Sequence, residues 1–456
     1  MNIIHTAIKR WRVLTGQGSF VKNVIIMLSG TAAAQGIGIV LSPLLAHLYT
    51  PEQYGELAVY MSILAISVLF GSLGFERAIP MEEDEEHIPY IVTFCFLLLV
   101  LLTGVFLAAI ILFAPMITDS FRIGMIVYLL PISFFGYGLY NTLNYWALRT
   151  RSYGPLARTK WVQGMGGILI QLAAPFVGLG RVGLVLGEVF GRVAGTGTLY
   201  TLFHKQFRPG QWARQANWSI MKKMVSRYRK IALYVTGSGV FTSMTLQMLP
   251  LFMAGYYGLK EAGSIALVDK VLGGPILLLS MSISQVFYAE SMKHARENPQ
   301  MLEQLFRDTF RKLCRIGVVP ILVIAVVGPP LFVWLFGAAW EPAAKYVPVY
   351  ALLYGVNILF SPVSVILESL RLQHWNFWWT VTRFLSLALG LLIVVWLQLS
   401  PLAAAILQAV ILGVFYLIIY RMSAIGIRKR KEEWMNSAAT GGTDTTVNER
   451  GDRSEA

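Results

Sequence analysis

Several charged side chains of this sequence stand inside or at the ends of long apolar segments, where charge is expensive to place. A charge at the centre of a membrane-spanning helix costs about 2.5–3.5 kcal/mol, so it is expected to face a bundle interior or a wet cavity. Basic groups there can bind an anion, and an acid can bind a proton or a cation. The residues of this kind are Glu76, Arg77, Arg149, Glu188, Arg192, Asp269, Lys270, Glu368, Arg371 and Arg383.

The spacing of these residues separates paired from unpaired charges. Glu188 and Arg192 are four residues apart and can pair on one helix face. A purely structural ion pair therefore remains an alternative to a functional role for these two residues. Asp269 and Lys270 are adjacent, so on a helix they point about 100° apart and cannot face the same partner. Arg383 lies about two turns into its apolar segment and has no partner on its own helix. We therefore expect functional roles for Asp269, Lys270 and Arg383.

The remaining bases have plainer alternatives. Arg77 and Arg371 lie at span ends, where interfacial anchors are common. Arg149 belongs to a basic turn with Arg151, Arg158 and Lys160, and such turns fix the topology of membrane proteins. A role in anion binding and a role in topology both stay open for these residues.

The composition places these charges in an all-α integral membrane protein. Of 456 residues, 56% are hydrophobic and 14% are charged, whereas a soluble protein carries about 25% charged residues. Apolar runs of 20 or more residues recur along the chain, which is the length that crosses a bilayer as a helix. We predict twelve spans, at 23–48, 54–76, 88–115, 123–148, 159–178, 182–203, 231–256, 262–290, 316–336, 346–370, 375–397 and 401–421.

The distribution of basic residues predicts the orientation. With the N-terminus in the cytoplasm, 31 of the 38 Lys and Arg residues fall on the cytoplasmic side, which places both termini there. The net charge of +14 then indicates contact with anionic lipid headgroups rather than with nucleic acid. The acidic run Glu82–Glu86 is expected to be a solvated turn on the same side.

The chain divides into two halves that resemble one another. Gly30 and Pro43 of the first span correspond to Gly237 and Pro250 of the seventh, both at an offset of 207 residues. Six spans in each half give a parallel repeat, with both halves in the same orientation. The predicted parts are a basic N-terminal segment, an N-lobe, a basic linker, a C-lobe and a cytoplasmic tail whose distal part is disordered, at 1–22, 23–203, 204–230, 231–421 and 422–456.

Signals for catalysis are weak in this sequence. The six His residues are scattered, the two Cys residues lie far apart, and there is no nucleotide-binding P-loop. The predicted extracytoplasmic loops are short, whereas a membrane glycosyltransferase or polymerase usually needs a larger one. We expect no enzyme activity, no metal and no cofactor.

The opening hairpin resembles that of bacterial oligosaccharide-lipid flippases, the polysaccharide transporter family of the multidrug/oligosaccharidyl-lipid/polysaccharide exporter superfamily. The stretches SPLLAHLYTPEQYGELAVY and GSLGFERAI carry the resemblance, and NYWALRTRSY is similar to the turn after the family's fourth span. The chain departs from the family pattern at His47 and Gly74, where members often have a base. The matching motif residues include Pro43, Tyr49, Pro51, Gly55 and Glu76.

The resemblance implies two six-helix lobes around a central cavity lined largely by spans one, two, seven and eight. It implies a flippase that moves polyprenyl-diphosphate-linked oligosaccharides across the bacterial inner membrane by alternating access, for O-antigen, capsule or exopolysaccharide synthesis, with possible polymerase or assembly partners. The candidates for the anion path are Arg77, Arg149, Arg192, Lys270, Arg371 and Arg383. The candidates for ion coupling are Glu188, Asp269 and Glu368.

Two other classes remain open from the sequence. A cation-coupled drug or metabolite antiporter of the same superfamily would also have twelve spans, but its cavity should be rich in acids. An integral membrane glycan polymerase or ligase would share the composition, and a long extracytoplasmic loop would favour it. The three bases inside spans favour an anionic substrate.

Overall fold

The computed structural model describes residues 35–203, 218–297, 299–370 and 372–439. Within these ranges the regular structure is helical throughout, with short 3₁₀ turns between several helices. The helices are α3 Ser42–Leu48, α4 Pro51–Ser67, α5 Ile88–Phe121, α6 Leu130–Arg149, α7 Tyr153–Ala173, α8 Gly180–Phe203, α10 Trp218–Phe252, α11 Leu259–Glu297, α12 Pro299–Phe336, α13 Glu341–Ala344, α14 Val347–Ser364, α15 Ile366–Ser369, α16 Gln373–Trp396 and α17 Pro401–Ala439.

The helices are long and apolar enough for a multi-pass membrane protein. Eight helical stretches of the described chain meet the length and hydropathy expected of a membrane span. Helices α7, α8 and α10 are also long enough to cross, but Gly, Lys and Arg residues make them less apolar. The all-α membrane architecture predicted from the sequence is therefore confirmed.

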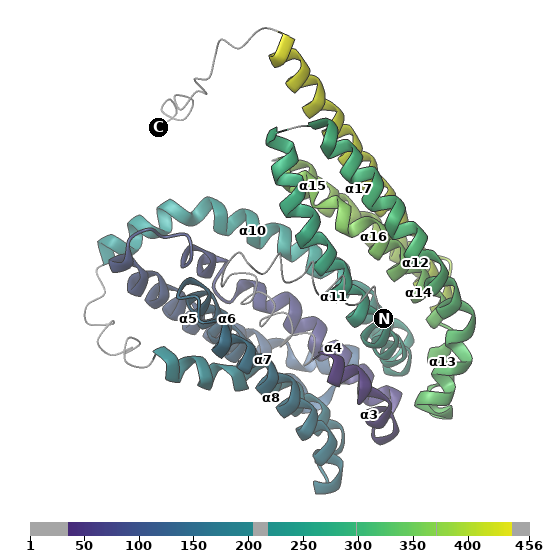
Figure 1. Ribbon diagram of the computed structural model, residues 1–456. Coiled ribbons are helices and arrows are strands. Elements are labelled where there is room, and N and C mark those ends of the chain that lie inside the picture. Colours follow the sequence, from purple (N-terminus) through teal and green to yellow (C-terminus); the bar gives the residue numbers. More distant parts are fainter. Residues whose placement is uncertain (1–34, 204–217, 298, 371, 440–456) are drawn as a thin grey trace, which may run out of the picture.

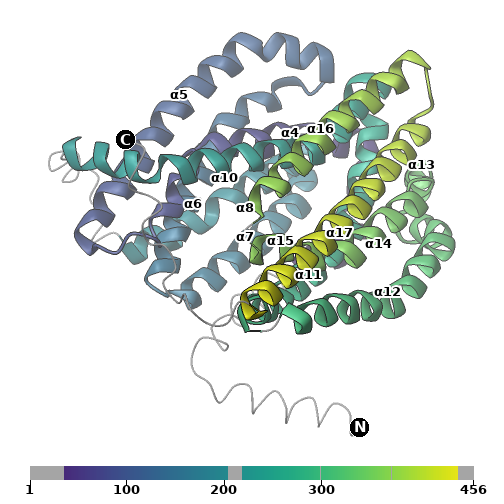
Figure 2. The same ribbon diagram turned by 90° about the horizontal axis from the view of Figure 1, so that it is seen from above.

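The helices form two groups that meet at one end. Figure 1 shows α5 to α8 on one side and α12 to α17 on the other, with α4 and α11 where the groups meet. The view in Figure 2 shows the same separation. The groups diverge toward the end at which α6 and α17 finish, which we call the basic end, and we call the other the closed end.

Glycines hold the two groups together at the closed end. Helix α4 begins at Pro51, where Thr50 and Gln53 form a capping box. A methyl group on Gly55 would lie 2.0 Å from the carbonyl oxygen of Leu259, at the start of α11. A methyl group on Gly263 would lie 1.8 Å from the carbonyl oxygen of Pro51. Only glycine permits backbones to approach this closely, so α4 and α11 pack directly against one another.

A tryptophan adds a second contact at the closed end. The indole Nε1 of Trp340 donates to the carbonyl oxygen of Ala46, 2.9 Å away. The ring of Trp340 also meets the ring of Tyr54 edge-on, with centroids 5.0 Å apart. These contacts join residues almost 300 positions apart and are fully buried.

The helices extend beyond the predicted spans at the basic end. Residues 218–230, predicted as linker, form the first turns of α10. Helix α11 extends to Glu297, and α12 begins at Pro299. Helix α17 continues to Ala439, well into the predicted tail. Basic amphipathic turns can be helical outside the hydrocarbon without a long apolar run. Hydropathy alone therefore underestimates the length of these helices. The segments 1–34, 204–217 and 440–456 lie outside the described residues.

Candidate functional site

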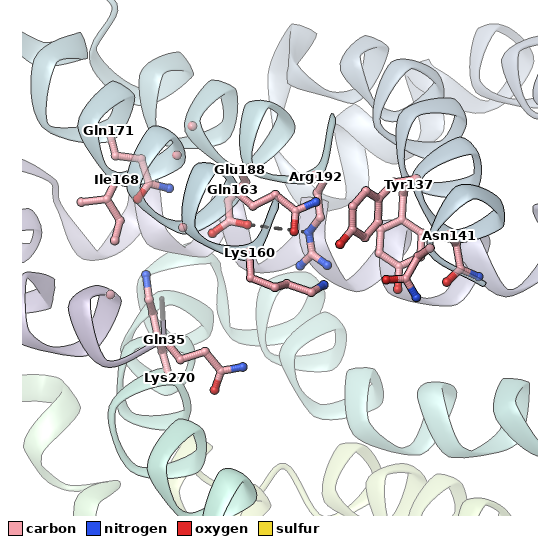
Figure 3. A pocket seen from close by; sticks show the side chains of 17 residues that line it. Gln35, Tyr137, Asn141, Lys160, Gln163, Ile168, Gln171, Glu188, Arg192 and Lys270 are labelled. Carbon is pink, nitrogen blue, oxygen red and sulfur yellow. Dashed lines mark ion pairs between the residues drawn. The ribbon is translucent and has the colours of Figure 1, made fainter. Parts of the chain in front are cut away.

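A polar cavity of about 400 Å³ lies among α6, α7 and α8, with contributions from the first helical turns and from α11. Helix α7 supplies a stripe with helical spacing, which includes Lys160, Gln163, Gly167 and Gln171. Figure 3 shows side chains from α7 and α8 projecting into the cavity. The cavity thus sits mainly in the N-terminal group of helices.

Three bases and one acid line this cavity. Lys160 comes from α7, Arg192 from α8 and Lys270 from α11. Glu188 lies one turn from Arg192, and the nearest oxygen and nitrogen of the pair are 3.9 Å apart. Both side chains of this pair are partly exposed to the cavity, so the pair is loose. The cavity therefore carries a net positive charge.

Uncharged polar groups and aromatic rings complete the lining. Asn141, Asn144 and Gln163 supply amides, which can both donate and accept hydrogen bonds. The ammonium of Lys160 lies 4.9 Å from the ring centroid of Tyr140, a cation–π contact that holds the side chain at the cavity wall. Such a lining suits a ligand that carries both hydroxyl groups and negative charge.

A glycine ladder on α8 brings this helix close to α7. Glycines recur every four residues, at Gly183, Gly187, Gly191 and Gly195. A methyl group on Gly187 would lie 2.6 Å from the carbonyl oxygen of Gly167 on α7. The residues that directly follow two of these glycines are Glu188 and Arg192, so the close packing of the two helices sets both charges at the cavity edge.

Two residues of the opening motif support the cavity from behind. Glu76 is buried and accepts hydrogen bonds from the hydroxyl of Ser72 and, at 2.9 Å, from the amide of Asn141. The hydroxyl of Tyr49 donates to the carbonyl oxygen of Gln171, 2.6 Å away. These motif residues therefore position cavity-lining residues on α6 and α7.

The chain matches the family described as polysaccharide biosynthesis protein over residues 44–345, about two thirds of its length. It belongs to this family. The resemblance that the opening hairpin carries is thereby confirmed.

A curated relative and two solved structures agree with the family. The succinoglycan biosynthesis transport protein ExoT of Rhizobium meliloti (strain 1021) is 21% identical over 383 residues, which cover 82% of this chain and 71% of the relative. An inward-facing multidrug resistance MATE family transporter of the MOP superfamily superposes with a TM-score of 0.71 at 14% identity, covering 89% of this chain and 96% of that one. The lipid II flippase MurJ, in an inward closed conformation, superposes with a TM-score of 0.70 at 13% identity, covering 92% of this chain and 94% of that one.

These likenesses give the protein the exporter-superfamily fold, with two lobes of helices. The chain is a multi-pass transmembrane transporter of the polysaccharide biosynthesis family, and its relatives are transporters rather than enzymes. The two similar structures share the fold at low identity, so they say nothing about individual site residues.

The cavity of this family member brings together Arg192 and Lys270 from the predicted anion path and Glu188 from the predicted coupling acids. Its lining differs from the expected one, because α6, α7 and α8 dominate it. Of the four helices expected to line it, the first contributes Gln35 and Gly38, and α11 contributes Lys270. Helix α4 instead packs against α11, and the described lining of the cavity includes no residue of α4 or α10.

Arg149 lies outside this cavity. Its guanidinium donates to the carbonyl oxygens of Ile79 (3.0 Å) and Glu82, and its Nη2 pairs with Glu85 at 2.9 Å. These contacts tie the loop after η2 (Phe75–Ala78) to the end of α6. The structure thus gives Arg149 a role in holding this loop at the basic end.

Glu82, expected in a solvated turn, is buried instead. Tyr228 of α10 donates a hydrogen bond of 3.0 Å to it, and Arg227 lies 3.5 Å away. Burial alone would raise the pKa of Glu82, but hydrogen bonds from the Asp84 backbone and Tyr228, with the charge of Arg227, outweigh it and lower the pKa. The stabilisation is present above the ordinary pKa and is lost as pH falls through the lowered value.

The other predicted bases are scattered. Arg77 is exposed in η2. Arg383 on α16 is buried in the C-terminal group, with its guanidinium 4.3 Å from the ring centroid of Trp379. Arg77 and Arg383 do not line the described cavity with Arg192 and Lys270. Arg371 lies outside the described residues.

The two other predicted coupling acids also differ in position. Asp269 on α11 accepts a hydrogen bond of 2.5 Å from the hydroxyl of Tyr354 on α14. Its neighbour Lys270 lines the cavity, so the two charges face different sides of α11, as their spacing predicts. Glu368 is exposed on the short helix α15.

Lys160 and the amides of the cavity were not among the site residues predicted from the sequence. Lys160 stands near a basic turn, and its proximity to Arg158 favoured a role in topology. The signal that could have identified it is the helical spacing of Lys160, Gln163 and Gln171 on a glycine-rich helix. A polar stripe on a membrane span must face a partner or water.

Proposed function

We propose that this transporter moves a polyprenyl-diphosphate-linked oligosaccharide from the cytoplasmic to the outer leaflet of the bacterial inner membrane by alternating access. The observation that carries the proposal is the joint presence of Lys160, Arg192 and Lys270, against Glu188 alone, in one amide-lined cavity. A diphosphate carries charge that these bases can neutralise. The succinoglycan relative supports a role in surface polysaccharide biosynthesis.

Each part of the cavity suits one part of this substrate. The planar guanidinium of Arg192 can bind a phosphate with two parallel hydrogen bonds, whereas Lys160 and Lys270 act as point charges. The amides of Asn141, Asn144 and Gln163 can exchange hydrogen bonds with sugar hydroxyl groups. The apolar polyprenyl tail would remain in the bilayer, because burying it in a polar cavity gains nothing.

The charge distribution supports the proposed direction of transport. Basic residues follow the end of α6 and occupy the last turns of α17, at the end where the two helix groups diverge, and we propose that this end lies in the cytoplasm together with both termini. The glycine contacts between α4 and α11 close the other end. This arrangement supports entry of the anionic headgroup from the cytoplasmic leaflet.

Coupling to an ion gradient is proposed for one acid above the others. Glu188 has Arg192 as its neighbour, and Glu368 is exposed at a helix end. Asp269 lies within α11 and is hydrogen-bonded to a neutral tyrosine, without a base in the pair. We therefore propose Asp269 as the group that binds the coupling proton or cation.

A double substitution of cavity bases tests the proposed function. Lys160→Ala with Arg192→Ala removes two cationic hydrogen-bonding groups, and we expect transport to fall about 100-fold or more. The measurement is the rate at which a fluorescent polyprenyl-diphosphate glycan crosses proteoliposome membranes. Protein amount in the vesicles is checked by immunoblot.

The matched control removes two bases from the same region that do not line the cavity. Arg151→Ala with Arg158→Ala alters two exposed residues and should leave transport within about twofold of the unaltered protein. Equal loss in both double variants, or no loss in the cavity variant, would refute the assignment of the cavity to the diphosphate.

A further inference from the structure

A second basic cavity lies between α12 and α17 at the basic end, in the C-terminal group and apart from the N-terminal cavity. Its volume is about 420 Å³. Four arginines line it, Arg307 and Arg311 from α12 and Arg421 and Arg428 from α17. The proposed transport cycle gives these residues no task.

Acids pair with two of the four arginines and leave the other two unpaired. Glu303 binds Arg307 through one oxygen at 2.6 Å and Lys431 through the other at 3.1 Å, and Asp308 pairs loosely with Arg311 at 3.8 Å. Within the described part of the chain, neither Arg421 nor Arg428 forms an ion pair. The two unpaired arginines leave the cavity positively charged and able to accept an anion.

The floor of the cavity is aromatic and rigid. The rings of Phe306 and Tyr420 stack with centroids 4.9 Å apart, and Phe310 lies 4.6 Å from Tyr420. Phe360 of α14 meets Tyr420 edge-on at 5.6 Å. This packing keeps α12 and α17 at a fixed separation beneath the arginines.

Each helix continues from its arginines into an exposed apolar stripe. On α12 the residues Val318 and Leu322 follow Arg311 at helical spacing, and they are 39% and 52% exposed. On α17 the residues Val414 and Leu417 precede Arg421 on the same face, with 48% and 54% exposed. In a membrane span, an exposed apolar face contacts lipid chains. On α12 the step from Arg311 to Leu322 is eleven residues, about 16 Å, which matches one leaflet of the hydrocarbon core.

We propose that the second basic cavity and the two apolar stripes together form a groove that binds an anionic phospholipid of the surrounding bilayer, with its phosphodiester headgroup in the cavity. The arginines, Arg421 and Arg428 above all, hold the phosphate, and the acyl chains lie along the apolar stripes of α12 and α17. Arginine suits this task because its planar fork matches the geometry of phosphate oxygens. A soluble phosphate would use the arginines but not the stripes, which is why the groove favours a lipid.

Native mass spectrometry of the full-length protein in detergent tests the proposal. The probe is phosphatidylglycerol, with zwitterionic phosphatidylcholine for comparison. We expect phosphatidylglycerol to bind at least about tenfold more tightly, and the variant Arg421→Ala with Arg428→Ala to bind it roughly thirtyfold more weakly. A variant with lysine at both positions should retain most of the affinity, which separates loss of charge from loss of fold.

One control makes the result specific to this second basic cavity. Arg151→Ala with Arg158→Ala removes two exposed bases elsewhere and should bind phosphatidylglycerol like the unaltered protein. Equal binding of the two lipids, full binding by the Arg421 and Arg428 variant, or displacement by millimolar inorganic phosphate would overturn the proposal. None of these outcomes depends on transport, so the proposed function is tested separately.

Discussion

At the scale of single residues, Asp269 and Lys270 show how one helix can serve two sites. Lys270 lines the positively charged cavity, while Asp269 accepts a hydrogen bond from Tyr354 on the other side of α11. The two charges are adjacent along the chain but do not neutralise one another. A change in the charge of Asp269 can therefore act on the packing of α11 against α14 without occupying the substrate cavity.

This separation leads to a prediction for Asp269→Asn. The amide keeps the size of the side chain but cannot bind a proton or hold a cation as a carboxylate does. We expect gradient-driven transport to fall more than about tenfold, because the coupling step is lost, while equilibration of substrate without a gradient persists. Proteoliposomes with an imposed proton or sodium gradient, measured against vesicles without one, give both rates.

The matched control for this prediction is Asp308→Asn on α12. Asp308 is partly exposed at the basic end and pairs only loosely with Arg311, at 3.8 Å. It should keep the full response to the gradient. A response of the Asp269 variant equal to that of the Asp308 variant would exclude Asp269 as the coupling acid.

At the scale of helices, the contact between α4 and α11 decides which end of the protein is closed. The methyl group in Gly55→Ala would meet the backbone oxygen of Leu259, which a side-chain rotation cannot relieve. We expect the variant to force the two helices apart and so to open the closed end. Ser62, seven residues further along α4, is 1% exposed and donates to Gln247 at 2.9 Å, so it reports on this opening.

The measurement is thiol labelling of Ser62→Cys in a background without Cys95 and Cys314. A membrane-impermeant maleimide, added from the closed end, should label this cysteine several times faster with Gly55→Ala than without it. Gly104→Ala on α5 is the matched control, because a methyl group there meets nothing within 4 Å. Unchanged labelling in a folded Gly55→Ala protein would show that this contact does not close the end.

At the scale of the whole molecule, the sequence predicted most of the fold. Apolar length is a local property, so the described helices follow most of the predicted spans, and the opening hairpin identified the family. Helix ends beyond the membrane were missed, as in α10 and α17, because polar helical turns lack a hydropathy signal. Because Asp269 and Lys270 are adjacent on a helix, the sequence predicted that they face different partners, and they do.

The cavity was harder to predict because it depends on which helices approach closely. The ladder from Gly183 to Gly195 lets α8 pack on α7, and this non-local contact places Arg192 beside Lys160. Arg149 and Arg383 were predicted for the anion path together with Arg192, yet Arg149 holds a loop and Arg383 stacks on Trp379. A charge in a span predicts a buried or wetted site, but only packing decides which site it shares.

The central claim is that the cavity beside Arg192 holds a diphosphate-linked glycan lipid. The most direct measurement is mass spectrometry of lipids that remain bound to the purified protein, compared between the unaltered chain and the variant Lys160→Ala with Arg192→Ala. We predict a polyprenyl-diphosphate oligosaccharide with the unaltered protein and at least a tenfold lower amount with the variant. Equal amounts in both proteins, or co-purification of cationic small molecules without any such lipid, would contradict the claim.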